Sequence, residues 1–310
     1  MTFSLRDRFS RQSWLYEHLV YHSDWWSIPD DQLHRIKEGL KRFNVERPLV
    51  SICIPIWNEE DGLIKTLSSI ASLDIPYPTE LVFINNNSTD ETMPILEYMG
   101  VNVINEPRQG IAHARLTGLK RSKGKYIICG DADTLYPSGW INHLVRPLIL
   151  QSNVKCAYGL HAYLPTRNTS RISWTLYELT SFVITLLRRR KREFLNVHGC
   201  NFSFRRDEGL AVKGFEMSIT RTFDLNRKDP GFVIFGEDGR MGRKLGEIGK
   251  LKLVSEFKAA VWTNPRRILK EDGSLLQALA CRIWIEAGLI YTYLFGSIEL
   301  DHTSDDIIIP

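Results

Sequence analysis

The pattern of hydrophobic and polar positions changes at Leu49, where strand and helix signals begin to alternate. A run that is apolar on both faces, as in a strand buried within a parallel sheet, opens this region, and later runs resemble it. The predicted strands cover residues 49–55, 80–85, 101–105 and 126–130. Apolar residues at helical spacing predict helices between them, over 60–73, from near Asp90, and over 110–120. Strands alternating with helices in this way predict an α/β fold, the nucleotide-binding half of a doubly wound sheet.

The pattern is less regular beyond residue 133 but still predicts helices and strands. We expect helices over 140–150, through 174–187 and from near Glu237, and strands over 155–160 and 196–204. A C-terminal helix is expected from about Ser274 to Tyr293. The apolar segments 172–187 and 274–298 are too short or too charged for membrane spans. We therefore expect three parts: a helical extension (1–47), a main domain (48–265, divided at 135/136) and a C-terminal helical segment (266–310).

Composition narrows the class of protein. The chain has 310 residues, 43% of them hydrophobic, and a net charge of +4, which is too mild to indicate a nucleic-acid partner without a basic patch. Five scattered cysteines without a CxxC spacing predict buried thiols in a reducing compartment. The N-terminus carries charge where a signal peptide needs an apolar core, so we expect a cytoplasmic protein.

Two carboxylates, Asp131 and Asp133, follow the predicted strand 126–130. In an open α/β sheet the ligand crevice lies at the carboxyl ends of the strands, and residues i and i+2 of an extended segment point the same way. Clustered carboxylate oxygens suit Mg²⁺ or Mn²⁺, the ions that accompany diphosphates. The alternative is that these residues serve only as turn or helix-cap residues.

Other phosphate-binding and metal-binding motifs are missing or weak. The sequence has neither GxGxxG after its first strand nor GxxxxGK[ST], so a bound diphosphate would need a metal ion. His18 and His22 have the i, i+4 spacing of helical metal ligands, but no general-base Glu lies between them. We interpret both as surface or core histidines.

Five segments, in order and at similar spacing, resemble the inverting glycosyltransferases of family 2, which have the GT-A fold. They cover about residues 48 to 265. The segments are Val50-Ser51-Ile52-Cys53-Ile54-Pro55-Ile56-Trp57-Asn58-Glu59-Glu60, Ile84-Asn85-Asn86-Asn87-Ser88-Thr89-Asp90, Arg108-Gln109-Gly110 with Ala114-Arg115, the Asp131-Ala132-Asp133 segment, and His198-Gly199-Cys200-Asn201 with Gly236-Glu237-Asp238.

The resemblance implies a fold, a reaction and site residues. It implies a Rossmann-like, mostly parallel sheet flanked by helices, and transfer of a single sugar from a nucleotide-diphosphate sugar, with UDP-sugars favoured, to a glycan or lipid-linked acceptor in surface polysaccharide or glycolipid synthesis. Asp133 would bind the Mn²⁺ or Mg²⁺ ion, with Asp131 as a second candidate ligand, and Asp238 would be the general base. By the same resemblance the donor-binding residues are Pro55, Ile56, Asn58, Glu59, Asn86, Arg108, Arg115, Asp131 and Asp133, and the acceptor side contains Asn201 and Glu237.

One departure from the family pattern affects the donor. The family carries an acidic pair in the second segment, where this chain has Asn85 and Asn86. An amide both donates and accepts hydrogen bonds, whereas a carboxylate only accepts them, so we expect a different base or binding register. The alternatives are an inactive nucleotide-sugar-binding scaffold of the same fold, or a sugar nucleotidyltransferase.

A run of cations, Arg188-Arg189-Arg190-Lys191-Arg192, ends the predicted helix through 174–187. A solvated face that complements the helix dipole is the first interpretation. Contact with a phosphorylated acceptor or with anionic headgroups at the inner face of the membrane is the second.

Overall fold

A computed structural model describes residues 13–21, 24–164, 171–217 and 236–266, together with Leu275, Ala280 and Ile283. The helical elements in these ranges are α2 (Ser13–Leu19), η1 (Trp25–Ser27), α3 (Asp30–Leu40), η2 (Lys41–Phe43), α4 (Glu60–Ala71), α5 (Thr92–Met99), α6 (Ile111–Arg121), α7 (Trp140–Leu150), α8 (Arg171–Arg188), η3 (Glu193–Asn196), α9 (Arg206–Ala211), α10 (Glu237–Glu247) and η4 (Phe257–Ala259). The strands are β1 (Val50–Ile56), β2 (Thr79–Asn85), β3 (Asn102–Asn105), β4 (Tyr126–Cys129), β5 (Thr134–Leu135), β6 (Val154–Gly159), β7 (His161–Tyr163), β8 (Phe202–Arg205), β9 (Lys250–Val254) and β10 (Val261–Thr263).

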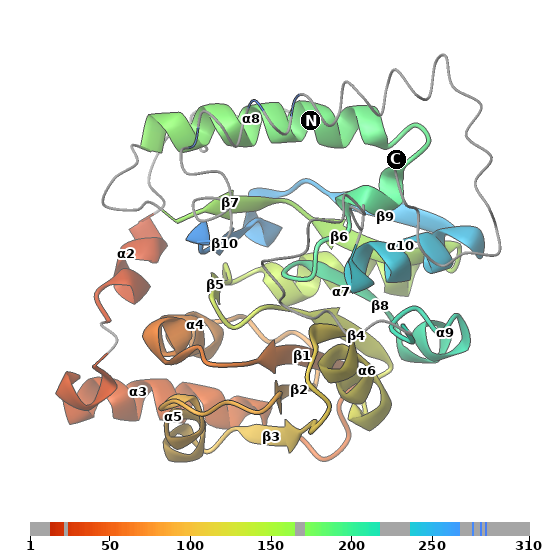
Figure 1. Cartoon of the computed structure of the whole chain (residues 1–310). Helices are drawn as coiled ribbons and strands as arrows, with labels where there is room; N and C mark the ends of the chain where they lie inside the picture. Colours follow the sequence, from red (N-terminus) through yellow and green to blue (C-terminus); the bar gives the residue numbers. More distant parts are fainter. Residues whose placement is uncertain are drawn as a thin grey trace, which may run out of the picture.

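A seven-stranded sheet forms the centre of the protein (Figure 1), with the strand order β3-β2-β1-β4-β8-β6-β9. The pairs β1/β2, β1/β4, β2/β3 and β6/β9 are parallel, whereas β8 runs antiparallel to both of its neighbours, β4 and β6. The expected mostly parallel sheet is therefore confirmed. Because β1, β2 and β4 are parallel, their carboxyl ends and the polar residues that follow them meet at one edge.

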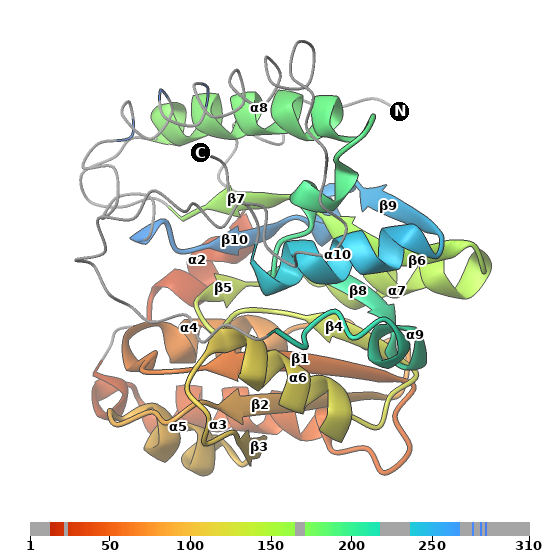
Figure 2. The same ribbon diagram turned by 45° about the vertical axis from the view of Figure 1, so that its right-hand side comes forward.

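Helices cover both faces of this sheet, as the apolar pattern predicts. Alternate residues of β1 point to opposite faces, so Ile52 and Ile54 belong to one core cluster and Cys53 to the other. The first cluster includes the apolar sides of α4, α5 and α7, and the second those of α6 and α10 (Figure 2). Strands β1, β2 and β4 are thus buried on both sides, whereas the edge strand β3 is partly exposed.

The N-terminal helices join this core directly. Leu33, Ile36 and Leu40 of α3 belong to the same buried cluster as β1 and α4. His18 is a buried core histidine, with its Nδ1 2.8 Å from the Ser68 Oγ, while His22 lies outside the described residues. The described part of the extension is helical, as expected, and α3 packs as part of the main domain.

Some predicted elements differ from the structure. The predicted strand 196–204 was wrong over its first half, where η3 and a turn precede β8. The apolar residues there meet the core from a turn and not from alternating strand positions. Strand β9 and a three-stranded sheet, β5-β10-β7, were not predicted. Four cysteines are buried thiols, as expected. Cys281 and nearly all of the expected helix 274–293 lie outside the described residues. In the described ranges no helix has the length and apolarity needed to cross a membrane.

Candidate active site

Asp131 and Asp133 lie at the carboxyl end of β4, in a segment held by Tyr136. The Tyr136 hydroxyl accepts a hydrogen bond from the Asp131 N–H and donates one to the Asp131 carbonyl, both at 2.7 Å. A Cβ on Gly130 would lie 2.5 Å from that hydroxyl oxygen, so no larger residue fits before Asp131. The hydroxyl of Tyr136 therefore fixes the backbone that carries the two carboxylates.

Arg115 on α6 joins this segment to the start of α10. The side chain is 2% exposed, and its Nη2 donates to Asp131 Oδ1 at 2.7 Å while its Nε donates to Glu237 Oε1 at 3.3 Å. A buried guanidinium needs such paired carboxylates to offset the loss of its hydration. A Cβ on Gly199 would lie 2.2 Å from the same Nη2, so the glycine makes room for this bridge.

Asp238 lies beside this bridge and is held by backbone donors. Its Oδ2 accepts a hydrogen bond from the Gly199 N–H at 2.8 Å, and its Oδ1 accepts one from the Gly239 N–H at 2.7 Å. Burial raises the pKa of Asp238 above the usual value for aspartate, and burial together with the charge of Asp238 raises the pKa of Glu237. A carboxylate with a raised pKa is a stronger base, which is the property that proton abstraction from a hydroxyl requires.

Asp133 and Glu59 converge on the guanidinium of Arg266, which follows β10. Arg266 Nη2 lies 3.3 Å from Asp133 Oδ2 and also contacts Glu59 Oε1. Over the described ranges no three His, Cys, Asp or Glu side chains gather as a ready-made metal cage. Neighbouring carboxylates repel one another unless a cation lies near them. The oxygens of Asp133 and Asp131 fit a metal ion that takes its remaining ligands from a diphosphate and water.

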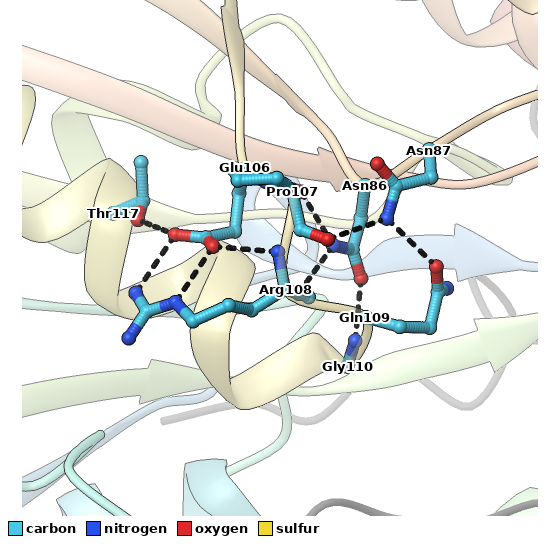
Figure 3. A network of polar contacts seen from close by, with 8 residues as sticks. All are labelled: Asn86, Asn87, Glu106, Pro107, Arg108, Gln109, Gly110 and Thr117. Carbon is cyan, nitrogen blue, oxygen red and sulfur yellow. Dashed lines mark hydrogen bonds and ion pairs between the residues drawn. The ribbon is translucent and has the colours of Figure 1, made fainter.

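The segment that follows β2 holds the loop that follows β3 (Figure 3). Asn86 is buried; its Nδ2 donates to the carbonyls of Glu106 at 2.9 Å and Arg108 at 2.8 Å, and its Oδ1 accepts the Gly110 N–H at 2.7 Å. Its neighbour Asn87 is exposed and donates to the Pro107 carbonyl at 3.0 Å. Because a carboxylate has no hydrogens to donate, the amide of Asn86 is required by the backbone of this loop.

Glu106 is the second anchor of the loop. It accepts hydrogen bonds from the Arg108 backbone and guanidinium at 2.9 Å and from the hydroxyl of Thr117, which is on α6. These hydrogen bonds, above all those from Arg108, lower the pKa of Glu106 to about 2. The loop thus leads into α6, the helix that carries Arg115, with a fixed geometry.

Comparison with known proteins identifies the family. The model described as "Glycosyl transferase family 2" matches residues 51–208, about half of the chain. This chain belongs to that family. The match includes the segments that carry Asn86, Arg115, Asp131 and Asp133.

Curated relatives are similar over shorter stretches. A poly-beta-1,6-N-acetyl-D-glucosamine synthase of Staphylococcus epidermidis is 34% identical over 91 residues, which is 28% of this chain and 22% of that protein. A dolichol-phosphate mannosyltransferase of Saccharomyces cerevisiae is 30% identical over 107 residues, 32% of this chain and 40% of that protein. The chain thus matches less than half the length of either relative.

Solved structures show the GT-A fold for this family 2 glycosyltransferase. A mannosyltransferase from Pyrobaculum calidifontis, in complex with GDP-Man and Mn²⁺, superposes with a TM-score of 0.50 and 18% identity over 85% of this chain and 77% of that chain. Glucosyl-3-phosphoglycerate synthase from Mycobacterium tuberculosis has a TM-score of 0.48 and 16% identity over 82% of this chain and 84% of that one.

Four other residues that were expected in the site of this glycosyltransferase are buried or make contacts within the protein. Pro55 and Ile56 are buried at the end of β1. Asn58 has a φ of 52° and accepts the Thr89 N–H on its Oδ1 at 2.8 Å, which ties the turn after β1 to the turn after β2. Arg108 is engaged with Glu106 as described above.

Asn201 is placed more deeply than the sequence suggests. Its side chain is fully buried, donates to the carbonyls of Leu160 and Ala259 at 2.7 and 2.9 Å, and accepts the Trp140 Nε1–H at 2.9 Å. Every polar atom of this side chain is therefore used inside the protein. Asn201 precedes β8 and fixes the end of the neighbouring strand β6.

Two features of the site were missed from the sequence. Arg266 follows β10, a three-residue strand too short to give a periodic signal. A small pocket of about 20 Å³ lies between the inner face of α8 and the segment β6–β7. Its lining includes Tyr158, His161 and Asn196, and also His198, the residue before the glycine that binds Asp238.

Proposed function

We propose that this family 2 enzyme is an inverting glycosyltransferase that moves one sugar from a nucleotide-diphosphate sugar, with UDP-sugars favoured, to a glycan or lipid-linked acceptor. The observation that carries the proposal is the Arg115 bridge between Asp131, at the expected donor edge, and Glu237, next to the candidate base. This buried guanidinium holds a carboxylate of the proposed donor site next to the residue that precedes the candidate base. The distances of 2.7 and 3.3 Å bring residues from β4, α6 and α10 into one cluster.

The proton chemistry falls to Asp238. As the acceptor hydroxyl oxygen bonds to the anomeric carbon, its proton passes to a carboxylate oxygen of Asp238. The bond from that carbon to the nucleoside diphosphate breaks on the opposite face, and the electron pair stays on the phosphate oxygen. One such displacement inverts the configuration. The two backbone N–H donors on Asp238 orient its carboxylate and leave each oxygen a further acceptor site.

The leaving group needs positive charge. Mn²⁺ or Mg²⁺ held by Asp133, with Asp131 as a second candidate ligand, would neutralise the charge that develops on the nucleoside diphosphate. Glu59 and Asp133 bind the Arg266 guanidinium in the structure, which supports this edge as a place for cations.

The comparisons support a nucleotide-sugar donor and two acceptor classes. The archaeal neighbour is in complex with GDP-Man and Mn²⁺, and the two curated relatives are named for a polysaccharide product and for dolichol phosphate. We place the acceptor beside His198, where a small pocket opens between α8 and the segment β6–β7. Aromatic, imidazole and amide side chains, such as Tyr158, His161 and Asn196, suit a hydroxyl-rich ligand.

Two variants test the roles of the carboxylates separately. Asp238→Asn should reduce turnover at least a thousandfold, within the range of a lost general base, while leaving donor binding by calorimetry nearly unchanged. Asp133→Asn should remove metal-dependent donor binding and turnover together. Normal turnover by the first variant, or tight metal-independent donor binding by the second, would refute the corresponding role. Binding of a UDP-, GDP- or dTDP-sugar by the wild type without any turnover would favour the inactive scaffold.

A further inference from the structure

The outer face of α8 is aliphatic where a surface helix is normally polar. Between Arg171 and Leu187, every exposed residue of α8 is Ile, Leu or Val. Their exposed fractions range from 37% to 68%, and they recur at spacings of three and four along one stripe. The six residues are Ile172, Leu176, Leu179, Val183, Leu186 and Leu187.

The orientation of the helix is fixed by its inner face. Glu178 is buried, pairs with Arg171 at 2.7 Å and accepts the Tyr163 N–H at 2.8 Å, while Trp174 is fully buried against Tyr163. Turning the aliphatic stripe inward would expose Trp174 and break the hydrogen bond from the Tyr163 N–H to Glu178, so these contacts fix which face of α8 points outward. Among the described helices and strands, Figures 1 and 2 both show α8 lying beyond the two sheets.

Cations lie at the end of the same helix. The run of five after Leu187 includes Arg189, Arg190 and Lys191, which are exposed. No acidic residue of α8 is exposed, because Glu178 is its only acid and is buried. Arg189 pairs with Glu193 at 3.2 Å. A second copy of α8 would offer Arg190 and Lys191 no exposed carboxylate of its own, whereas an anionic lipid surface offers both an apolar layer and negative headgroups.

We propose that the aliphatic stripe of α8 and the exposed cations after it form a docking face for an anionic bilayer surface, on which α8 lies flat without crossing. The inner side of the same helix lines the pocket beside His198. Docking would therefore hold that pocket close to the headgroups. This last consequence, presentation of the pocket to a lipid-linked acceptor, rests on the proposed function, whereas docking itself does not.

The test is cosedimentation of the full chain with vesicles of phosphatidylcholine alone or mixed with phosphatidylserine, which requires no turnover. We expect binding to the mixed vesicles that weakens with salt. Leu176→Gln and Val183→Gln should each weaken it roughly tenfold, because each removes a half-exposed aliphatic side chain from the contact. Leu150→Gln, at the end of α7 and 65% exposed, is the matched control and should change nothing.

A second pair of variants separates the charge from the apolar contact. Arg190→Gln with Lys191→Gln should weaken binding to the anionic vesicles about thirtyfold and leave binding to phosphatidylcholine unchanged. Lys123→Gln with Lys125→Gln removes two exposed cations elsewhere and should have no effect. Wild type that stays in the supernatant, or equal losses in test and control variants, would overturn the proposal. So would variants of the stripe that convert a dimer to a monomer without affecting vesicle binding.

Discussion

Replacing Asn86 by aspartate would test the network that positions the site. The substitution N86D keeps the shape of the side chain and restores the acidic character that the family usually has in this segment. It also removes the two hydrogens donated to the carbonyls of Glu106 and Arg108 and places a carboxylate oxygen 2.8–2.9 Å from them. We therefore expect destabilisation, with the loop before α6 released first.

The magnitude follows from counting these groups. Each lost hydrogen bond costs about 1 kcal/mol net, and each buried acceptor left unpaired adds about 1 kcal/mol or more, so the sum is about 4 kcal/mol. Such a loss is a large fraction of the stability of a typical domain, ~5–15 kcal/mol. For a chain of this size it corresponds to a fall in Tm of roughly 10 °C. Activity should fall as well, because the loop sets the start of the helix that carries Arg115.

Urea denaturation of N86D and wild type near neutral pH, and again near about pH 5, is the appropriate assay. Burial beside carbonyl oxygens raises the pKa of the introduced carboxyl above its unfolded value. The deficit should thus be largest above that raised pKa and shrink as the pH falls through it. Asn87→Asp is the matched control, since Asn87 is exposed, and should cost less than about 1 kcal/mol. Equal stability of N86D and wild type, or an equal loss in both variants, would refute this account.

Three further outcomes follow from the same geometry. The depressed pKa of Glu106, about 2, means that this carboxylate stabilises the fold above about pH 4.5 and loses that effect as the pH falls toward 2; Glu106→Gln should flatten the acid limb of a denaturation profile. Arg115→Lys should lower kcat/KM about a hundredfold, because one ammonium does not reproduce the two-carboxylate bridge, and steady-state assays would show it. Gly199→Ala should lower the free energy of unfolding by about 1–3 kcal/mol, because its Cβ would lie 2.2 Å from the Arg115 guanidinium. An unchanged Tm in thermal melts would contradict this expectation.

The first half of the fold could be predicted because its signals are local. Segments such as 49–55 are apolar on both faces, and their pattern alone indicates a strand buried between two helical layers. The carboxylates after β4 could also be found, since polar residues at a strand end stand out against an apolar run. Local patterns failed where elements are very short, as in β5 and β10, or where a turn interrupts an apolar stretch, as before β8.

The pairings within the site were beyond sequence reasoning for another reason. Arg115 and Glu237 are 122 residues apart, and Glu59 and Arg266 are 207 apart, so only the folded sheet brings them together. The role of Asn86 also became clear only from contacts between segments that are far apart in the sequence. The sequence suggested an altered contact to the nucleotide base, while the structure shows an amide fully used by the loop after β3.

Arg115 also shows why this cluster is more than a structural ion pair. Its Nη2 and Nε have carboxylate partners, but its buried Nη1 has no hydrogen-bond partner among the described residues. A buried donor left unpaired costs about 1–3 kcal/mol, so an acceptor oxygen supplied by a ligand would stabilise this site. An oxygen of the donor sugar or its diphosphate, arriving beside Asp131, would satisfy that hydrogen. If the proposed donor site is correct, we expect donor binding to stabilise the protein by about the energy of that hydrogen bond, which thermal melts with and without nucleotide sugar would measure.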